Sequence, residues 1–79
     1  MARGRIVRHV IELDMLDPEG IRKTLKRQGI DMQVIDPDGP GGGCPVVRLT
    51  GTPTKLVGLC FARGYNEVRF VRNEVGQAS

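Results

Sequence analysis

The segment DPDGPGGGCP, residues 36–45, gathers glycines and prolines around two carboxylates and a cysteine. A glycine-rich loop binds phosphate when a Lys-Ser or Lys-Thr pair and a helix follow, because the first helical amides then face the anion. Here the strand-like stretch PVVRLT follows instead. A calcium loop of the EF-hand type needs a bidentate carboxylate at its twelfth position, which is occupied by Val47. We therefore interpret the segment as a long, mobile hairpin connection whose glycines supply positive φ values.

The other side chains that could do chemistry are isolated from one another. Cys44 and Cys60 form no CxxC pair, and His9 is the one histidine, so a zinc site of the usual spacing is not expected. No nucleophile stands beside a base, and the acidic stretch ELDMLDPEG occupies the place where an acylphosphatase has its anion loop. We expect no enzyme activity, no cofactor and no metal, and we interpret His9 as a half-buried core residue.

The charge of the chain is mildly basic, at +3 in 79 residues. Such an excess permits an anionic partner without requiring one. No apolar run approaches the ~18 residues of a membrane span, and no secretory signal follows the first residues. We therefore expect a cytoplasmic protein without a membrane partner, folded as one domain over residues 1–75 with a flexible tail at 76–79.

An internal repeat organises the chain, since Asp17-Pro18 recurs as Thr52-Pro53. Asp and Thr are N-cap types, and proline suits the first helical position. Gly29 and Gly64 stand at matching places and suit the left-handed residue that ends a helix. The repeat predicts helices over residues 18–28 and 53–63.

Strand patterns flank both helices: RIVRHVIEL, DMQVID, PVVRLT and NEVRFVRNEV. The order is therefore β-α-β-β-α-β. Two βαβ halves with right-handed crossovers intercalate into a four-stranded antiparallel sheet with both helices on one face. We predict an α+β, ferredoxin-like fold with strand order 4-1-3-2; another α+β sandwich with the same order of elements is the alternative.

Alternation along the strands assigns side chains to the two faces of the sheet. The face toward the helices is predicted to carry Val7, His9, Ile11, Leu13, Met32, Val34, Val47, Leu49, Val68 and Phe70. These residues would pack under Ile21, Leu25, Leu56, Leu59, Cys60 and Phe61.

The opposite, open face is predicted to present arginines from three adjacent strands among β-branched side chains. Mixed patches of this kind often mark interfaces, and arginine suits planar recognition of carboxylate or phosphate. A homodimer could form through the same face, and the alternative is a solvated face with scattered β-formers. The predicted binding residues are Arg8, Val10, Val46, Arg48, Arg69 and Val71.

The residues leave two further classes of function as alternatives. Sheets that read RNA stack bases on aromatic side chains, but Phe61, Tyr65 and Phe70 are the only aromatics here. Nucleic-acid binding through the backbone phosphates therefore remains an alternative. The stretch IELDMLDPEGIRKTLKRQGIDMQVI resembles the opening of an ACT-type regulatory domain over about a third of the chain. That resemblance implies a small-molecule sensor.

The unit VVRLTGTPTKLVGLCFARGY, in a small and arginine-rich chain, resembles small phage and mobile-element proteins that bind host machinery. Anti-CRISPR inhibitors are one such class. The resemblance implies a non-enzymatic protein-binding module that contacts a protein subunit. Because the chain is basic, mimicry of nucleic acid is not expected.

Overall fold

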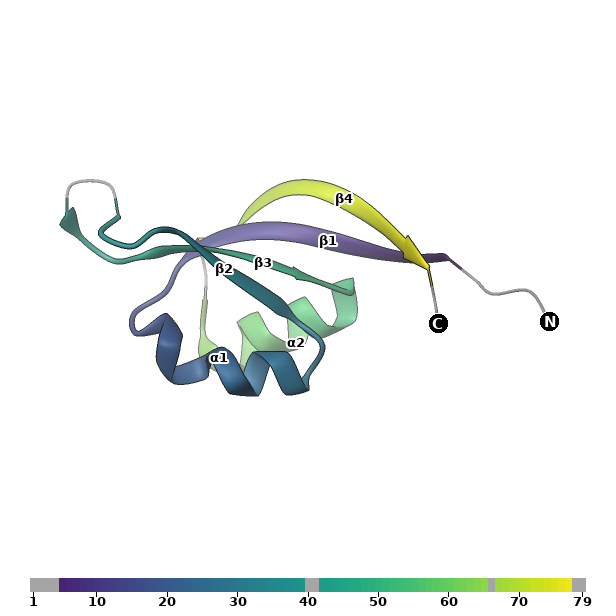
Figure 1. Ribbon diagram of the computed structural model, residues 1–79, viewed down its shortest axis with the longest axis horizontal. Helices are drawn as coiled ribbons and strands as arrows, with labels where there is room; N and C mark the ends of the chain where they lie inside the picture. Colours follow the sequence, from purple (N-terminus) through teal and green to yellow (C-terminus); the bar gives the residue numbers. More distant parts are fainter. Residues whose placement is uncertain (1–4, 40–41, 66, 78–79) are drawn as a thin grey trace.

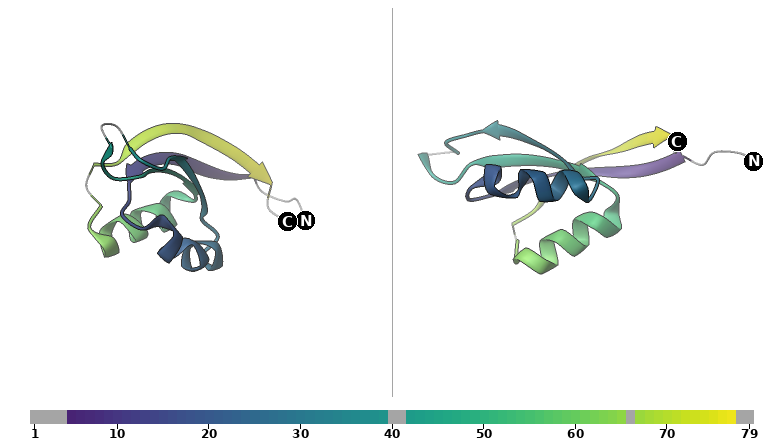
Figure 2. Two further views of the ribbon diagram at one scale, coloured as in Figure 1. Left: turned by 60° about the vertical axis from the view of Figure 1, so that its left-hand side comes forward. Right: turned by 60° about the horizontal axis from the view of Figure 1, so that its bottom comes forward.

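The computed structural model describes residues 5–39, 42–65 and 67–77 of the chain (Figure 1). Its elements are β1 (Arg5–Asp14), α1 (Pro18–Arg27), β2 (Asp31–Asp36), β3 (Val46–Gly51), α2 (Pro53–Arg63) and β4 (Arg69–Gln77). The strands form one antiparallel sheet of order β2-β3-β1-β4, which is β4-β1-β3-β2 when read from the other edge. Both helices lie on the same face of the sheet (Figures 1 and 2). The predicted α+β class is confirmed.

The helix ends follow the repeat, but the helix starts do so only in part. Gly29 and Gly64 have φ values of 76° and 73°, as predicted for residues that end a helix. Asp17 and Thr52 occupy the N-cap positions as predicted, but neither makes a side-chain capping hydrogen bond. Asp17 adopts a left-handed conformation with φ 50°, and its carboxylate lies so close to Gly20 that a Cβ there would overlap it.

The core lies between the helices and the central strands. It contains both residues predicted from the sequence and two additional ones, Met15 and Ile30, which lie just outside β1 and β2. The buried cluster is Ile11, Leu13, Met15, Ile21, Leu25, Ile30, Val47, Leu49, Leu56 and Leu59.

Four predicted core residues are exposed instead. Val7 on β1 is 47% exposed. Phe61 is 90% exposed, Phe70 is 59% exposed and Val68 is 38% exposed. The register pairs Phe70 with Ile11, so Phe70 does point toward the helix side of the sheet. The helices, however, pack against β1, β2 and β3 rather than beneath the edge strand β4 (Figure 2). Alternation predicted which face Phe70 is on, but not that the helices leave this edge of the sheet uncovered.

The connection between β2 and β3 is held at its described ends. Asp36 Oδ1 accepts hydrogen bonds from the backbone N–H groups of Asp38 and Gly39, at 3.3 and 3.0 Å. Gly39 is buried with φ 71°, and a Cβ at this position would overlap the Cys44 carbonyl oxygen. The glycine prediction is confirmed here, while Pro40 and Gly41 lie outside the described residues.

The last strand begins and ends later in the chain than predicted. β4 continues to Gln77, two residues beyond the predicted domain boundary at 75. Residues 78–79, the remainder of the predicted tail, lie outside the described residues. In Figure 1 the first half of β1 and the second half of β4 extend as a ribbon past the helices.

Candidate functional site

The arginine face, defined by Arg8, Arg48 and Arg69, forms on the open side of the sheet as predicted. Glu12 on β1 stands opposite Arg48 on β3 and opposite Arg69 on β4. Arg8 stands opposite Glu74. The three arginines therefore come from adjacent strands and share one surface.

Every arginine of this face is paired with a carboxylate. Arg48 donates to Glu12 Oε2 from Nε and Nη2, at 3.1 and 2.6 Å. Arg8 lies 3.0 Å from the Glu74 carboxylate and 3.4 Å from that of Asp31. Arg69 lies 3.6 Å from Asp14 Oδ1.

The arginine face therefore carries paired positive and negative charges and is not a basic patch. The carboxylates that neutralise it were missed, although alternation along β1 places Glu12 on the same face as Arg8. Exposed ion pairs of this kind each contribute at most about 1 kcal/mol to stability, so their main effect is on the surface potential. The ion-paired set consists of Arg8, Arg48, Arg69 and Arg72 with Glu12, Asp14, Asp31 and Glu74.

The aliphatic members of the predicted binding surface are largely covered. Val10 is fully buried and Val46 is 7% exposed. Val10 lies between Arg8 and Glu12 on β1, and the stems of such long side chains can lie over neighbouring apolar surface. Val71 is 37% exposed, beside the bulge that shifts the β1–β4 register. The bulge takes Val71 out of the predicted alternation, so a partner on this face could reach the arginine heads, but not Val10.

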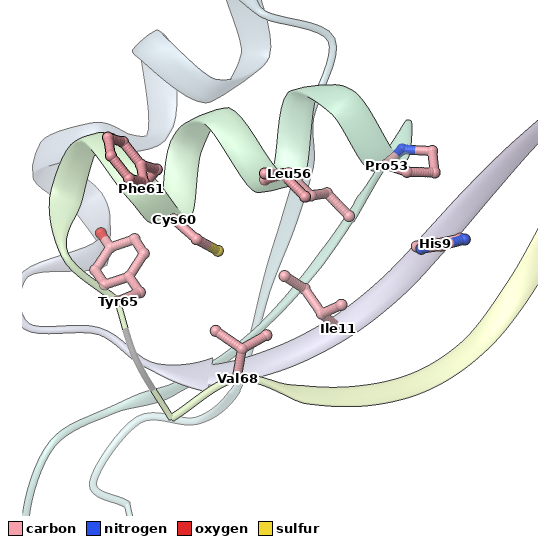
Figure 3. A pocket seen from close by; sticks show the side chains of 9 residues that line it. His9, Ile11, Pro53, Leu56, Cys60, Phe61, Tyr65 and Val68 are labelled. Atoms are coloured by element: carbon pink, nitrogen blue, oxygen red, sulfur yellow. The ribbon is translucent and has the colours of Figure 1, made fainter.

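A second surface is a hollow of about 470 Å³ between α2, β1 and the connection from α2 to β4, which we call the α2 groove (Figure 3). In Figure 3 the Cys60 side chain points from α2 into this hollow, with Leu56 and Tyr65 on either side. Ile11 and Val68 form the opposite wall. The lining is almost entirely apolar.

Two apolar side chains on α2 add to this groove. Val57 is 68% exposed and Phe61 is 90% exposed, and both line the groove. They stand four residues apart, so they neighbour each other on the helix surface. A helix that is apolar on several sides is normally covered on several sides. The sequence PTKLVGLCFAR carries that signal, although the sequence analysis predicts that Phe61 packs in the core.

Burial favours the neutral forms of two polar groups of the α2 groove, Cys60 and Tyr65. Burial raises the pKa of the Cys60 thiol and is also the main cause of the raised pKa of the Tyr65 hydroxyl. A protonated thiol is a poor nucleophile. His9 is half-buried, as predicted, and its ring meets that of Phe70 edge to face with centroids 5.3 Å apart. This arrangement suits the binding of an apolar side chain.

The two helices are basic. Together α1 and α2 carry six lysine and arginine residues and one carboxylate, Glu19. Glu19 is bound to Arg22, with a shortest contact of 2.6 Å. On α2 itself, Lys55 and Arg63 have no acidic neighbour in the helix sequence. A partner with carboxylates beside an apolar anchor would complement this side of the molecule.

Among the described residues, no group of three or more His, Cys, Asp or Glu side chains is placed to hold a metal ion. No helix in this part of the chain has the length and apolarity needed to cross a membrane. Comparisons with protein-family models, with curated proteins and with solved structures found no match. Function is therefore inferred from the fold and from these two surfaces.

Proposed function

We propose that the chain is a small, non-enzymatic protein-binding module with a ferredoxin-like fold. The fold assignment is supported by the β-α-β-β-α-β order, by the strand order β4-β1-β3-β2 and by two helices on one face. Folds of this kind host many unrelated functions. The function must therefore come from the surface rather than from the architecture.

The observation that carries the proposal is the exposed apolar surface of the α2 groove. Covering a side chain such as Phe61 contributes about 1.5–3 kcal/mol, and aromatic residues at the centre of an interface often dominate binding. Phe61 is 90% exposed and Val57 is 68% exposed beside a ready-made hollow. A partner that inserts one apolar side chain and covers Phe61 would gain both contributions.

The partner that fits is a protein segment with an apolar anchor flanked by acidic residues. The hollow accepts the anchor, and Arg63 at the end of α2, close to Tyr65, would bind a flanking carboxylate. The predicted resemblance to phage and mobile-element inhibitors agrees with a protein target. The identity of that target remains a prediction that rests on size and organisation.

The geometry gives less support to the nucleic-acid alternative. Backbone binding needs arginines that are free to neutralise phosphates, whereas Arg8, Arg48 and Arg69 each face a carboxylate of their own chain. The arginine face therefore remains a predicted contact surface, and we rank it below the α2 groove as a binding site.

The proposal can be tested with a random-peptide display library selected on the wild-type chain and counter-selected on Phe61→Asp. The matched control is Ala62→Asp, the next residue of α2, which is also exposed and changes the charge equally. We expect enriched peptides to carry an aromatic or aliphatic residue beside Asp or Glu. Their affinity should fall at least ~tenfold for Phe61→Asp, since tenfold is about 1.4 kcal/mol.

The control variant should bind these peptides like the wild type. Circular dichroism and melting curves should be the same for all three proteins. If no peptide survives counter-selection, or if both variants lose binding equally, the α2 groove is not the binding site and the proposed function fails.

A further inference from the structure

The two edges of the sheet are protected very differently against pairing with another strand. Edge strands expose unpaired N–H and C=O groups, and proteins blunt them with shortness, charge, proline or bulges. The β2 edge has all four devices: it has six residues, begins and ends with Asp31 and Asp36, has a register shift near its end, and is followed by Pro37. This edge is closed to pairing.

The β4 edge has fewer of these devices. It has nine residues and lacks proline, and its charged residues are Arg69, Arg72 and Glu74. Its one irregularity, at Val71, leaves the register regular from Arg72 to Gln77. Val75 is 57% exposed on the helix side of this strand, opposite Val7, which is 47% exposed. An isolated two-stranded ribbon is only marginally stable in water, so this part of the sheet would gain from a further strand.

We propose that β4 pairs antiparallel with β4 of a second copy of this chain, about a two-fold axis at Asn73. In that register Arg72 of each copy stands opposite Glu74 of the other. Val71 of each copy stands opposite Val75 of the other. Opposite charges and apolar pairs at facing positions stabilise antiparallel strands. The result is an eight-stranded sheet.

The charges select this register over its neighbours. If the axis moves one residue toward the N-terminus, Arg72 of one chain faces Arg72 of the other. If it moves one residue toward the C-terminus, Glu74 of one chain faces Glu74 of the other. Like charges directly opposite destabilise a strand pair. A shift of half a residue toward the C-terminus places Arg72 opposite Val75, which removes both favourable pairs.

The side chains agree with the pairing on both faces of the sheet. Arg72 and Glu74 are 54% and 38% exposed on the open face. Val71 and Val75 remain 37% and 57% exposed in the single chain. The surface used is the outer edge of β4, not the α2 groove, so this inference goes beyond the proposed function. A Phe61→Asp variant should dimerise normally even if it loses its partner.

The first experiment measures the mass of the protein by light scattering after size exclusion, loaded at about 100 μM, well above a micromolar dissociation constant. We expect a species of twice the 8.7 kDa chain mass. Arg72→Glu alone and Glu74→Arg alone should each weaken self-association about tenfold or more, because two attractive pairs become repulsive.

Mixing the two single variants should restore the dimer as a heterodimer. In the mixed pair, Glu at position 72 of one chain faces Arg at position 74 of the other, and the wild-type pair Arg72–Glu74 remains at the second site. Native mass spectrometry would show the heterodimer. Because Glu74 also contacts Arg8, circular dichroism must confirm that Glu74→Arg is folded.

A second experiment does not depend on that variant. In a Cys44→Ser, Cys60→Ala background, Asn73→Cys should form an intermolecular disulfide, because residues on the axis have Cα atoms about 5 Å apart. Arg72→Cys is the matched control, since the Cα atoms at position 72 of the two chains would lie about 8 Å apart. We expect Asn73→Cys to cross-link at least ~tenfold faster, since a Cα separation above ~7 Å prevents a strain-free bridge.

A wild-type chain that stays at monomer mass at this concentration overturns the proposal. A dimer that is insensitive to Arg72→Glu, or equal cross-linking of the two cysteine variants, overturns it as well, because either result places the contact on another surface.

Discussion

At the scale of single residues, the open sheet face shows how an ion pair within the chain changes the role of an arginine. Arg48 was predicted as a free recognition group, but the structure places both its Nε and Nη2 on Glu12. The pair is partly buried, with side chains 32% and 21% exposed. Arg48 therefore contributes to the sheet before it can contribute to binding.

Replacing Arg48 with Met should lower the free energy of unfolding by about 1 kcal/mol, the upper end for an exposed pair. The loss has two sources: the hydrogen bonds to Glu12 disappear, and that carboxylate is left without a partner. Urea denaturation measures the change. Arg22→Met, which removes the exposed pair with Glu19 on α1, is the control and should leave the midpoint close to that of the wild type. An equal loss in both variants would contradict the special role of the Arg48 pair.

Cys60 gives a prediction about pH. Burial raises the pKa of its thiol in the folded chain, so the folded state favours the protonated form. This contribution to stability is fully present below the ordinary pKa of the thiol and is lost as the pH rises through the raised value. In a Cys44→Ser background, the midpoint of alkylation rate against pH should lie higher for the folded chain than for the chain in urea. Coinciding midpoints would mean that the groove wall is open to water.

At the scale of elements, the glycines that end the helices are the most direct link between sequence and fold. Gly64 has φ 73°, and a Cβ at that position would meet no heavy atom within 4 Å. Gly64→Ala therefore isolates the backbone cost, which should be about 1 kcal/mol. Gly58→Ala, in the middle of α2 with equally open surroundings, should instead stabilise the chain by up to about 1 kcal/mol. Thermal melts with the same sign for both variants would contradict this account of the helix end.

The connection between β2 and β3 gives a second prediction at this scale, which compares a substitution at Gly39 with a deletion in the loop. Gly39→Ala should destabilise the chain by more than ~1 kcal/mol, because the new Cβ would meet the Cys44 carbonyl in a backbone region unsuited to alanine. Deleting Gly42 and Gly43 should cost well under ~1 kcal/mol, since loop-closure entropy varies slowly with length. Denaturant melts compare the two. A larger cost for the deletion would show that the loop itself, not its Gly39 end, is the ordered part.

The elements themselves could be predicted because their signals are local. Asp17-Pro18 and Thr52-Pro53 marked the helix starts, and period-two alternation separated Ile11 and Leu13 from Glu12. The coverage of β4 could not be predicted in this way, because it depends on where α2 lies across the sheet. Phe61 and Phe70 were placed in the core for that reason. Predicting the ion pairs of the arginine face requires the strand register. Alternation shows which face a side chain is on, but not which residue of the neighbouring strand stands opposite it.

At the scale of the whole molecule, charge and apolar surface are segregated. The helices are basic and α2 borders the apolar groove, while the opposite side of the sheet balances arginines with carboxylates. The open edge of β4 belongs to neither surface. One chain can therefore pair with a copy of itself through the edge and still present a groove to a different protein.

The central claim is that this groove, rather than the arginine face, binds the partner. The most direct test is a two-dimensional NMR titration of the labelled chain with a selected peptide that has an apolar anchor and acidic flanks. The account predicts that the largest amide shifts cluster at Val57, Cys60, Phe61 and Val68, while Arg8 and Arg48 stay unchanged. Shifts concentrated at Arg8, Arg48 and Arg69, with α2 unaffected, would contradict it.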